Sequence, residues 1–245
     1  GETTVNYNRD VEIFPVLNTI FEKIYGESPY KSPTDMGVNM AGNCICDDEA
    51  CREASKQEII RRYFDALNAL AKGSTSEKEA QKIELLMNMA GITVTDRKVV
   101  IKALERAKET DGPAAALELR DGRIITGKTT NLLGASAALL LNVLKVLAGI
   151  DHETHIISPE SIEPIQKLKV DYLKSKNPRL HTDEVLIALS ASAATNPQAR
   201  LALSQLPELA GCQAHTSVML SDVDIKIFKK LEVQLTSEAV YEHAL

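Results

Sequence analysis

Tryptophan is absent from this chain of 245 residues, and aromatic residues make up only 4% of it. Positive charge is also scarce, because 28 lysines and arginines face 34 aspartates and glutamates, which gives a net charge of −6. Proteins that bind nucleic acid typically carry a basic stripe, often with aromatic side chains that stack on bases. The sequence has no such stripe, and we therefore expect no nucleic-acid partner.

Cysteine and long apolar runs are scarce as well. Four cysteines in a chain of this length do not make the disulfide framework of a small secreted protein, so we expect a cytoplasmic protein. A membrane-spanning helix needs about 20 consecutive apolar residues. The most apolar stretch, 132–147, is interrupted by Asn142 and Lys145. No signal peptide is visible, and we expect no membrane partner.

Helical patterns fill the first part of the chain. Apolar spacing predicts helices over 10–25, 47–72, 76–90 and 95–109, and Ser76 with Glu79 predicts a capping box at the start of the third. Residues 110–113 have the composition of a linker. We therefore predict a helical domain over residues 1–112 and a second domain over residues 113–245.

The second domain begins with a predicted β-hairpin. Asp121-Gly122 lies between two apolar runs, a pattern typical of a type I′ turn with positive φ at both residues. The apolar stretch after it predicts a helix buried against a sheet. Alternating segments follow: strands at 155–158, 212–220 and 233–236, and helices at 159–174, 182–194, 198–206 and 222–230. This order predicts an α/β fold, a three-layer sandwich with a β-hairpin.

The hairpin overlaps a pattern associated with nucleotide binding. Residues 122–129 fit G-x-x-x-x-G-K-[ST], in which loop amides and the lysine bind phosphate. That chemistry needs a loop where Ile124 and Ile125 favour a strand, so we favour the hairpin. Two interpretations then remain for Lys128, Thr129 and Thr130. They form either an anion site at a helix start or a helix cap beside a solvated lysine.

Three further polar segments are candidate parts of a ligand site. Arg179, His181 and Asp183 share one loop-to-helix junction, where arginine suits phosphate and a histidine beside a carboxylate suits acid–base catalysis. Carboxylates are equally what the first turn of any helix prefers. The other two segments are the loop 32–39 and the stretch around His215. The candidate catalytic residues are His181, Asp183 and Asp35, and the candidate ligand-binding residues are Ser32, Thr34, Asn39, Lys128, Thr129, Thr130, Arg179 and His215.

Metal chemistry has a weaker basis. Cys44, Cys46 and Cys51 cluster near a helix start, and Cys212 lies far along the chain. Zinc sites usually combine two closely spaced cysteine or histidine pairs, and the sequence has no second pair. We predict free cysteines and no metal site.

Several long motifs resemble one known family. VNYNRDVEIFPVL, SPTDMGVNMAG, TGKTTNLLGASAALLLN and NPRLHTDEVLIAL are similar to the C-terminal half of a family of uncharacterised bacterial cytosolic proteins, defined by a domain of unknown function. The resemblance covers nearly the whole chain. It implies that the chain is a fragment of a protein about twice as long, whose N-terminal half has its own phosphate-loop-like segment. It implies no activity and no cofactor.

A second resemblance concerns the fold alone. A hairpin, a buried helix and then alternating strand and helix resemble the cytidine-deaminase type of sandwich. Those enzymes need H-x-E or C-x-E at the helix start and P-C-x-x-C downstream. Here the helix start reads Leu132-Leu133-Gly134-Ala135, and Cys212 stands alone, so a zinc deaminase is excluded.

Two functional hypotheses follow from these residues. In the first, the chain is an enzyme or half-enzyme that acts on a phosphorylated or nucleotide-like small molecule, in a cleft between the two halves. In the second, it is a structural, oligomerising half without its own active site, which packs against a missing N-terminal nucleotide-binding domain. We expect a homo-oligomer in either case.

Overall fold

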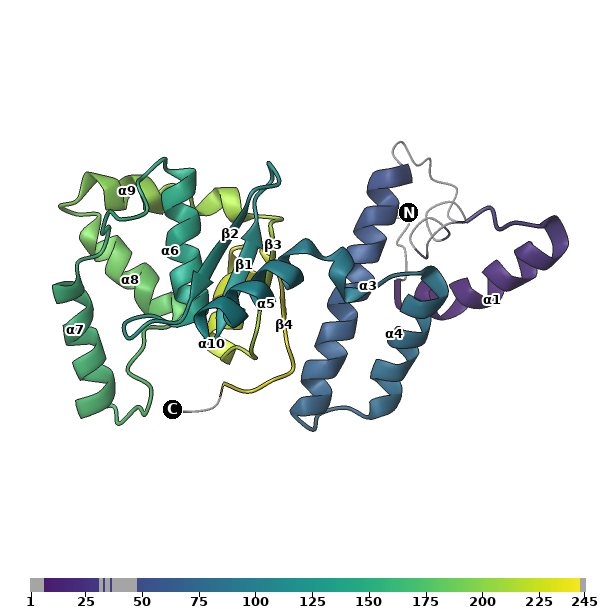
Figure 1. The fold of residues 1–245 in the computed structure, drawn as a ribbon, viewed down its shortest axis with the longest axis horizontal. Coiled ribbons are helices and arrows are strands. Elements are labelled where there is room, and N and C mark those ends of the chain that lie inside the picture. The colour runs from purple at the N-terminus through teal and green to yellow at the C-terminus, as the bar shows by residue number, and fades with distance from the viewer. Residues whose placement is uncertain (1–6, 31–32, 34–35, 37–47, 243–245) are drawn as a thin grey trace, which may run out of the picture. The chain divides into compact units, whose positions relative to one another are not determined.

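A computed structural model describes residues 7–30, 33, 36 and 48–242 (Figure 1). Contacts divide the chain into two compact units, residues 1–97 and 98–245. This division comes earlier than the boundary expected after residue 112. The difference arises because helix α5 (Lys98–Thr110) packs on the first three strands of the sheet. Residues 111–113 are then a tight turn between α5 and β1 within the second unit.

The first unit is helical in the part that the structure describes. It contains α1 (Tyr7–Tyr25), α3 (Asp48–Ala71), α4 (Glu77–Ala90) and the 3₁₀ turn Val94–Asp96. The capping box predicted at Ser76 is wrong, because that side chain makes no capping hydrogen bond. A capping box forms instead at the 3₁₀ turn, between Thr93 and Asp96. This capping box closes the turn that directly precedes α5.

The second unit contains a mixed sheet, which has four strands within residues 98–242. They are β1 (Ala114–Glu118), β2 (Ile124–Lys128), β3 (Gln213–Thr216) and β4 (Gln234–Ser237), in the order β2-β1-β3-β4. β1 is antiparallel to β2 and β3, and β3 is parallel to β4. As a result, β2, β3 and β4 run in the same direction, and their carboxyl ends lie at the same end of the sheet.

Helices cover both faces of this sheet. Alternate residues of β1 divide between them: Ala116 packs with α5, and Leu117 packs with α6 (Ala135–Leu147). The α6 side also holds α8 (Thr182–Ser192), α9 (Pro197–Leu203) and α10 (Asp222–Lys230). Figure 1 shows α6, α8 and α9 as one layer beside the strands. The predicted three-layer α/β sandwich is confirmed.

Two connections differ from the prediction. The strand expected at 155–158 is wrong: the chain bends at Ile156 and Ile157, whose side chains are buried without pairing of their backbone in the sheet. The helix predicted over 159–174 divides into α7 (Pro159–Lys167) and a π-helical turn, Leu168–Tyr172. That turn buries Lys169 beside the segment that enters α8.

The predicted hairpin is confirmed, with a different turn. Leu117 pairs with Ile125, and Glu118 pairs with Ile124. Only Gly122 of the turn has positive φ, +83°, and Leu119 pairs with Arg123 across three residues. This is a type I turn followed by a left-handed glycine, so the type I′ prediction is wrong. Residues 122–129 therefore wrap no phosphate, because 124–128 are a paired strand.

Candidate functional site

Helices α8 and α10 begin next to each other, and the segment leading into α8 is extended. Leu180 is buried and forms an isolated parallel bridge with Leu133, in the loop before α6. Its N–H donates to the carbonyl of Leu132, and its carbonyl accepts from the N–H of Gly134. Successive residues of an extended segment point to opposite sides. Arg179 and His181 therefore both point away from the buried Leu180.

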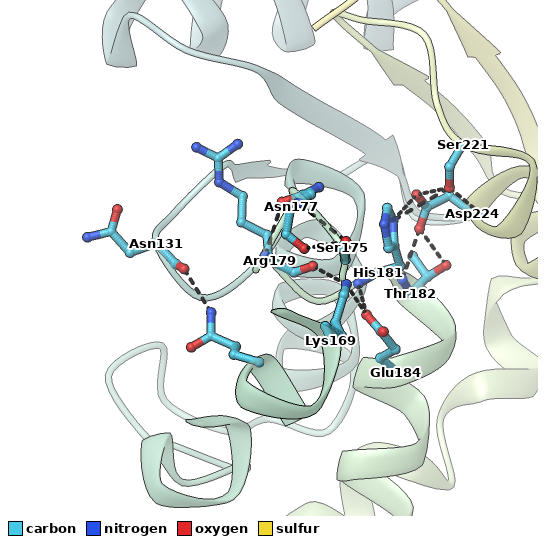
Figure 2. A network of polar contacts seen from close by, with 11 residues as sticks. Asn131, Lys169, Ser175, Asn177, Arg179, His181, Thr182, Glu184, Ser221 and Asp224 are labelled. Atoms are coloured by element: carbon cyan, nitrogen blue, oxygen red, sulfur yellow. Dashed lines mark hydrogen bonds and ion pairs between the residues drawn. The ribbon is translucent and has the colours of Figure 1, made fainter. Parts of the chain in front are cut away.

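Asp224 is the centre of the polar network at these helix starts (Figure 2). One carboxylate oxygen accepts from the backbone N–H of Thr182 at 2.9 Å and from its hydroxyl at 2.8 Å. The other lies 3.0 Å from His181 Nδ1 and accepts from the Ser221 hydroxyl at 2.7 Å. Asp224 is only 3% exposed, so these four hydrogen bonds replace the water that burial removes.

The network fixes the charges of its two titratable groups. Burial alone raises the pKa of Asp224, but the hydrogen bonds from His181, Thr182 and Ser221 outweigh it and lower this pKa to about 2. The hydrogen bond to Asp224 raises the pKa of His181 above its ordinary 6.5, against the opposing effect of burial. The pair is thus a carboxylate that stays ionised beside an imidazole whose protonated form it stabilises.

Asp224 also selects which nitrogen of His181 faces outward. An ionised carboxylate only accepts hydrogen bonds, so Nδ1 carries the hydrogen that binds Asp224. Among the described residues, no hydrogen bond to Nε2 is found, and the His181 side chain is 32% exposed. A buried carboxylate that holds Nδ1–H and leaves Nε2 for a reactant is the arrangement used in acid–base catalysis.

A second carboxylate and a buried lysine fix the backbone on both sides of Leu180. Lys169 is 6% exposed, and its Nζ donates to the carbonyl of Arg179 at 2.6 Å and to Glu184 Oε2 at 2.7 Å. The same Glu184 oxygen accepts from the backbone N–H of His181 at 2.8 Å. Lys169 therefore holds the backbone of Arg179 directly and the backbone of His181 through Glu184.

Arg179 occupies the outer side of this segment. Its Nε donates to the carbonyl of Thr130 at 3.1 Å, and its Nη1 donates to Glu242 at 2.7 Å. The Asn177 side chain accepts from the Arg179 backbone N–H. The guanidinium is thus held in one orientation, with its side chain 22% exposed.

The structure brings together only some of the residues predicted from the sequence. Thr130, Arg179 and His181 lie in one network, as described above. Asp183 belongs to the first turn of α8, and one of its carboxylate oxygens is buried and has no partner within the described residues. The carboxylate that pairs with His181 is Asp224, because residues two apart on a helix do not face each other.

The side chains of Lys128 and His215 lie on the α5 face of the sheet. Gly127 lies against α6, so its neighbour Lys128 points to the α5 side, where its side chain is exposed. His215 pairs with Ala116 and shares its α5-facing side; it is fully buried and contacts Thr236 and Glu238. Thr129 continues the pairing of β2, with its N–H on the Pro113 carbonyl.

Other predictions fall on residues that the structure does not describe. Ser32, Thr34, Asp35 and Asn39 lie outside the described residues, as do Cys44 and Cys46. Cys212 is a buried free cysteine. Within the described residues, no group of three or more metal-binding side chains is found. The same residues contain no helix long and apolar enough to cross a membrane.

Three members of the network lie outside the polar segments predicted from the sequence: Lys169, Ser221 and Asp224. Ser221 and Asp224 have the S-x-x-D spacing of a helix start, and the Ser221 hydroxyl does cap α10. That signal predicts a cap, but not its contact with His181, which lies 43 residues earlier. A hollow of about 440 Å³ between α7 and α8 is lined by His155, Ser161 and Ile187 among others, without His181.

Comparison with known proteins places the chain in a family. Residues 95–245 match "Domain of unknown function DUF1846, C-terminal", and residues 1–91 match "Domain of unknown function DUF1846, N-terminal". The prediction of a C-terminal half alone is therefore corrected, because residues 1–91 match the N-terminal domain of the family.

Similar proteins come from several bacteria. A UPF0371 protein of Corynebacterium aurimucosum is 60% identical over 98% of this chain and 48% of its own length. UPF0371 protein DIP2346 of Corynebacterium diphtheriae is 57% identical over 99% of the chain and 49% of its own length. UPF0371 protein str1377 of Streptococcus thermophilus is 53% identical over the same shares. The chain spans about half the length of these curated relatives, and with both domain matches it belongs to the DUF1846 family.

Proposed function

We propose that residues 98–245 contain the proton-transfer site of an enzyme that acts on a phosphorylated or nucleotide-like small molecule. His181 is the group that gives or takes the proton at Nε2, and Asp224 orients it. The observation that carries this proposal is the His181–Asp224 pair itself, in which a buried carboxylate holds Nδ1 and the other nitrogen has no partner among the described residues.

The guanidinium of Arg179 supports an anionic substrate. Arg179 lies on the same side of the extended segment, and a guanidinium binds phosphate through parallel hydrogen bonds. His181 is also the N-cap residue of α8, and the helix dipole favours negative charge at this end of the helix. Lys128, Thr129 and His215 are left out of this site because of their place on the sheet. Asp183 is left out as well, because helix geometry directs its side chain away from His181.

The raised pKa of His181 suits the proposed chemistry near neutral pH. Its imidazolium can protonate the oxygen of a leaving group, and the neutral imidazole can accept a proton from an attacking hydroxyl. Asp224 stays ionised throughout, since its pKa of about 2 is far below that range. Its role is to hold the ring and to stabilise the imidazolium.

One observation favours the structural alternative. Apolar side chains are exposed at the end of the π-helical turn and on α8, with Tyr172 at 72%, Leu173 at 68% and Ile187 at 68%. Exposed apolar groups of this size are typical of surfaces that pack against another protein. Sedimentation of the purified chain tests this alternative, because a self-associating surface there predicts an oligomer that Leu173→Glu dissociates.

Phosphate release from a panel of phosphate monoesters and nucleotides, followed from pH 5 to 8, tests the proposed enzyme. We expect His181→Gln to lower the rate by about 100-fold or more, the usual contribution of a general acid or base. His152→Gln is the control, because His152 is an exposed histidine whose side chain makes no described contact. Equal rates in the two variants would contradict the proposal.

A further inference from the structure

The segment after β4 connects the two loops that build the His181 site. The carbonyl of Val240 accepts from the N–H of Met219 at 2.8 Å, two residues before Ser221. Glu242 binds Arg179 at 2.7 Å, two residues before His181. Residues 240–242 therefore reach from the loop of Ser221 and Asp224 to the loop of His181. The same two loops are joined again by the His181–Asp224 contact.

We propose that residues 240–242 form a strap across the His181 site, and that Glu242 occupies on Arg179 the position of the substrate's anionic group. This inference rests on the proposed function, and it identifies Arg179 as the residue that selects a phosphate or carboxylate group. The strap must leave Arg179 before such a group can bind there.

The arginine is organised independently of Glu242. Thr130 holds its Nε, Asn177 holds its backbone N–H, and Lys169 holds its carbonyl. Removal of Glu242 therefore leaves the guanidinium in place, with Nη1 directed at the vacated position. Carboxylate and phosphate bind a guanidinium with the same geometry, so the carboxylate of the chain itself is a chemical stand-in for an external anion.

The strap is attached weakly enough to open. Val240 is 51% exposed and Tyr241 57% exposed, and the Glu242 side chain is 37% exposed. The two contacts found between the strap and these loops are one backbone hydrogen bond and one partly exposed ion pair. Ion pairs of this kind contribute little to stability. Opening the strap therefore costs little free energy, which allows an external phosphate to compete with Glu242 for Arg179.

Titration with inorganic phosphate tests the strap, with the NMR signals of the Arg179 Nε–H and the His181 ring as readouts. We expect Glu242→Gln to bind phosphate roughly three- to fivefold more tightly than the unmodified chain, the effect of losing one such ion pair. Glu163→Gln is the control, because it removes the same charge from the exposed face of α7. Arg179→Gln should abolish the gain when combined with Glu242→Gln.

Three results would overturn the strap: equal phosphate affinity in Glu242→Gln and Glu163→Gln, no phosphate binding by Glu242→Gln, or a gain that survives Arg179→Gln. The outcome is separable from that of the proposed enzyme. If phosphate affinity rises in Glu242→Gln and this gain depends on Arg179, the anion site and its strap are supported. If no turnover depends on His181 in the same protein, the catalytic role of His181 is rejected.

Discussion

Residues 122–129 and residues 179–184 show opposite relations between pattern and site. The first segment fits a phosphate-binding pattern at every required position, and it forms a hairpin strand whose second glycine lies against α6. The second fits no catalytic pattern, yet it binds Lys169, Asp224 and Glu242 in one network. A short pattern fixes residue types, whereas a site depends on the backbone that carries them.

We expect the largest loss of stability at Lys169, which holds the backbone of the segment 179–184. Lys169→Met should destabilise the protein by about 3–5 kcal/mol, because it removes a buried cation that binds both the partly buried Glu184 and the carbonyl of Arg179. Urea unfolding measures this loss. Lys167→Met, on the exposed part of α7, should change stability by less than about 0.5 kcal/mol. A loss below about 1 kcal/mol for Lys169→Met would mean that the ion pair does not hold the segment.

The next effect concerns the glycines of the hairpin. In Gly127→Ala the new Cβ would lie 2.2 Å from Leu139 N and 2.9 Å from the Ala135 carbonyl, so α6 must move off β2. We expect a loss of about 3 kcal/mol in urea unfolding. Gly122→Ala meets nothing within 4 Å and loses about 1 kcal/mol through its positive φ. Equal losses would contradict the role assigned to Gly127.

The sequence predicts most of this fold because local patterns specify its elements. Helix α10 begins and ends where its pattern predicts, and the hairpin pairs as the apolar runs indicate. The strand expected at 155–158 fails because two buried isoleucines fit a packed turn as well as a strand. The pattern of apolar residues indicates which side chains are buried. In a run of only four residues it does not indicate whether the backbone pairs in a sheet.

The site is predicted only in part, for a different reason. Arg179 and His181 were identified by residue type within one short segment. Asp224 was not, because its contact with His181 exists only once α8 and α10 begin side by side. The sequence instead suggested Asp183, a near neighbour that helix geometry directs elsewhere. Local spacing thus located one residue of the His181–Asp224 pair.

The pH dependence of stability tests the Asp224 contacts. The pKa of Asp224 falls from 3.8 to about 2 on folding, so the carboxylate stabilises the fold above pH 3.8 by about 2 kcal/mol, and this is lost as pH falls through 2. The raised pKa of His181 stabilises the fold below pH 6.5, and this is lost as pH rises through the raised value.

Asp224→Asn should therefore cost most between about pH 4 and 6.5, and least near pH 2. Urea unfolding at each pH measures the difference, and the His181 ring signals should show its pKa falling in the variant. Asp171→Asn, which replaces an exposed carboxylate in the π-helical turn, is the control. A cost that does not change with pH would show that packing, rather than charge, dominates at Asp224.

The smallest expected effect lies at Lys128, and it separates the two segments most directly. The sequence groups Lys128 with Arg179 as ligand-binding residues, whereas the strand turns Lys128 toward the α5 side and leaves its side chain exposed. Lys128→Ala should therefore change the affinity for inorganic phosphate by less than about twofold, the weak contribution of a distant, screened charge. Arg179→Gln in the same titration should remove most of the binding, because the guanidinium supplies directed hydrogen bonds as well as charge. If Lys128→Ala weakens phosphate binding as much as Arg179→Gln does, the long lysine side chain reaches round the end of β2, and the grouping made from the sequence is right.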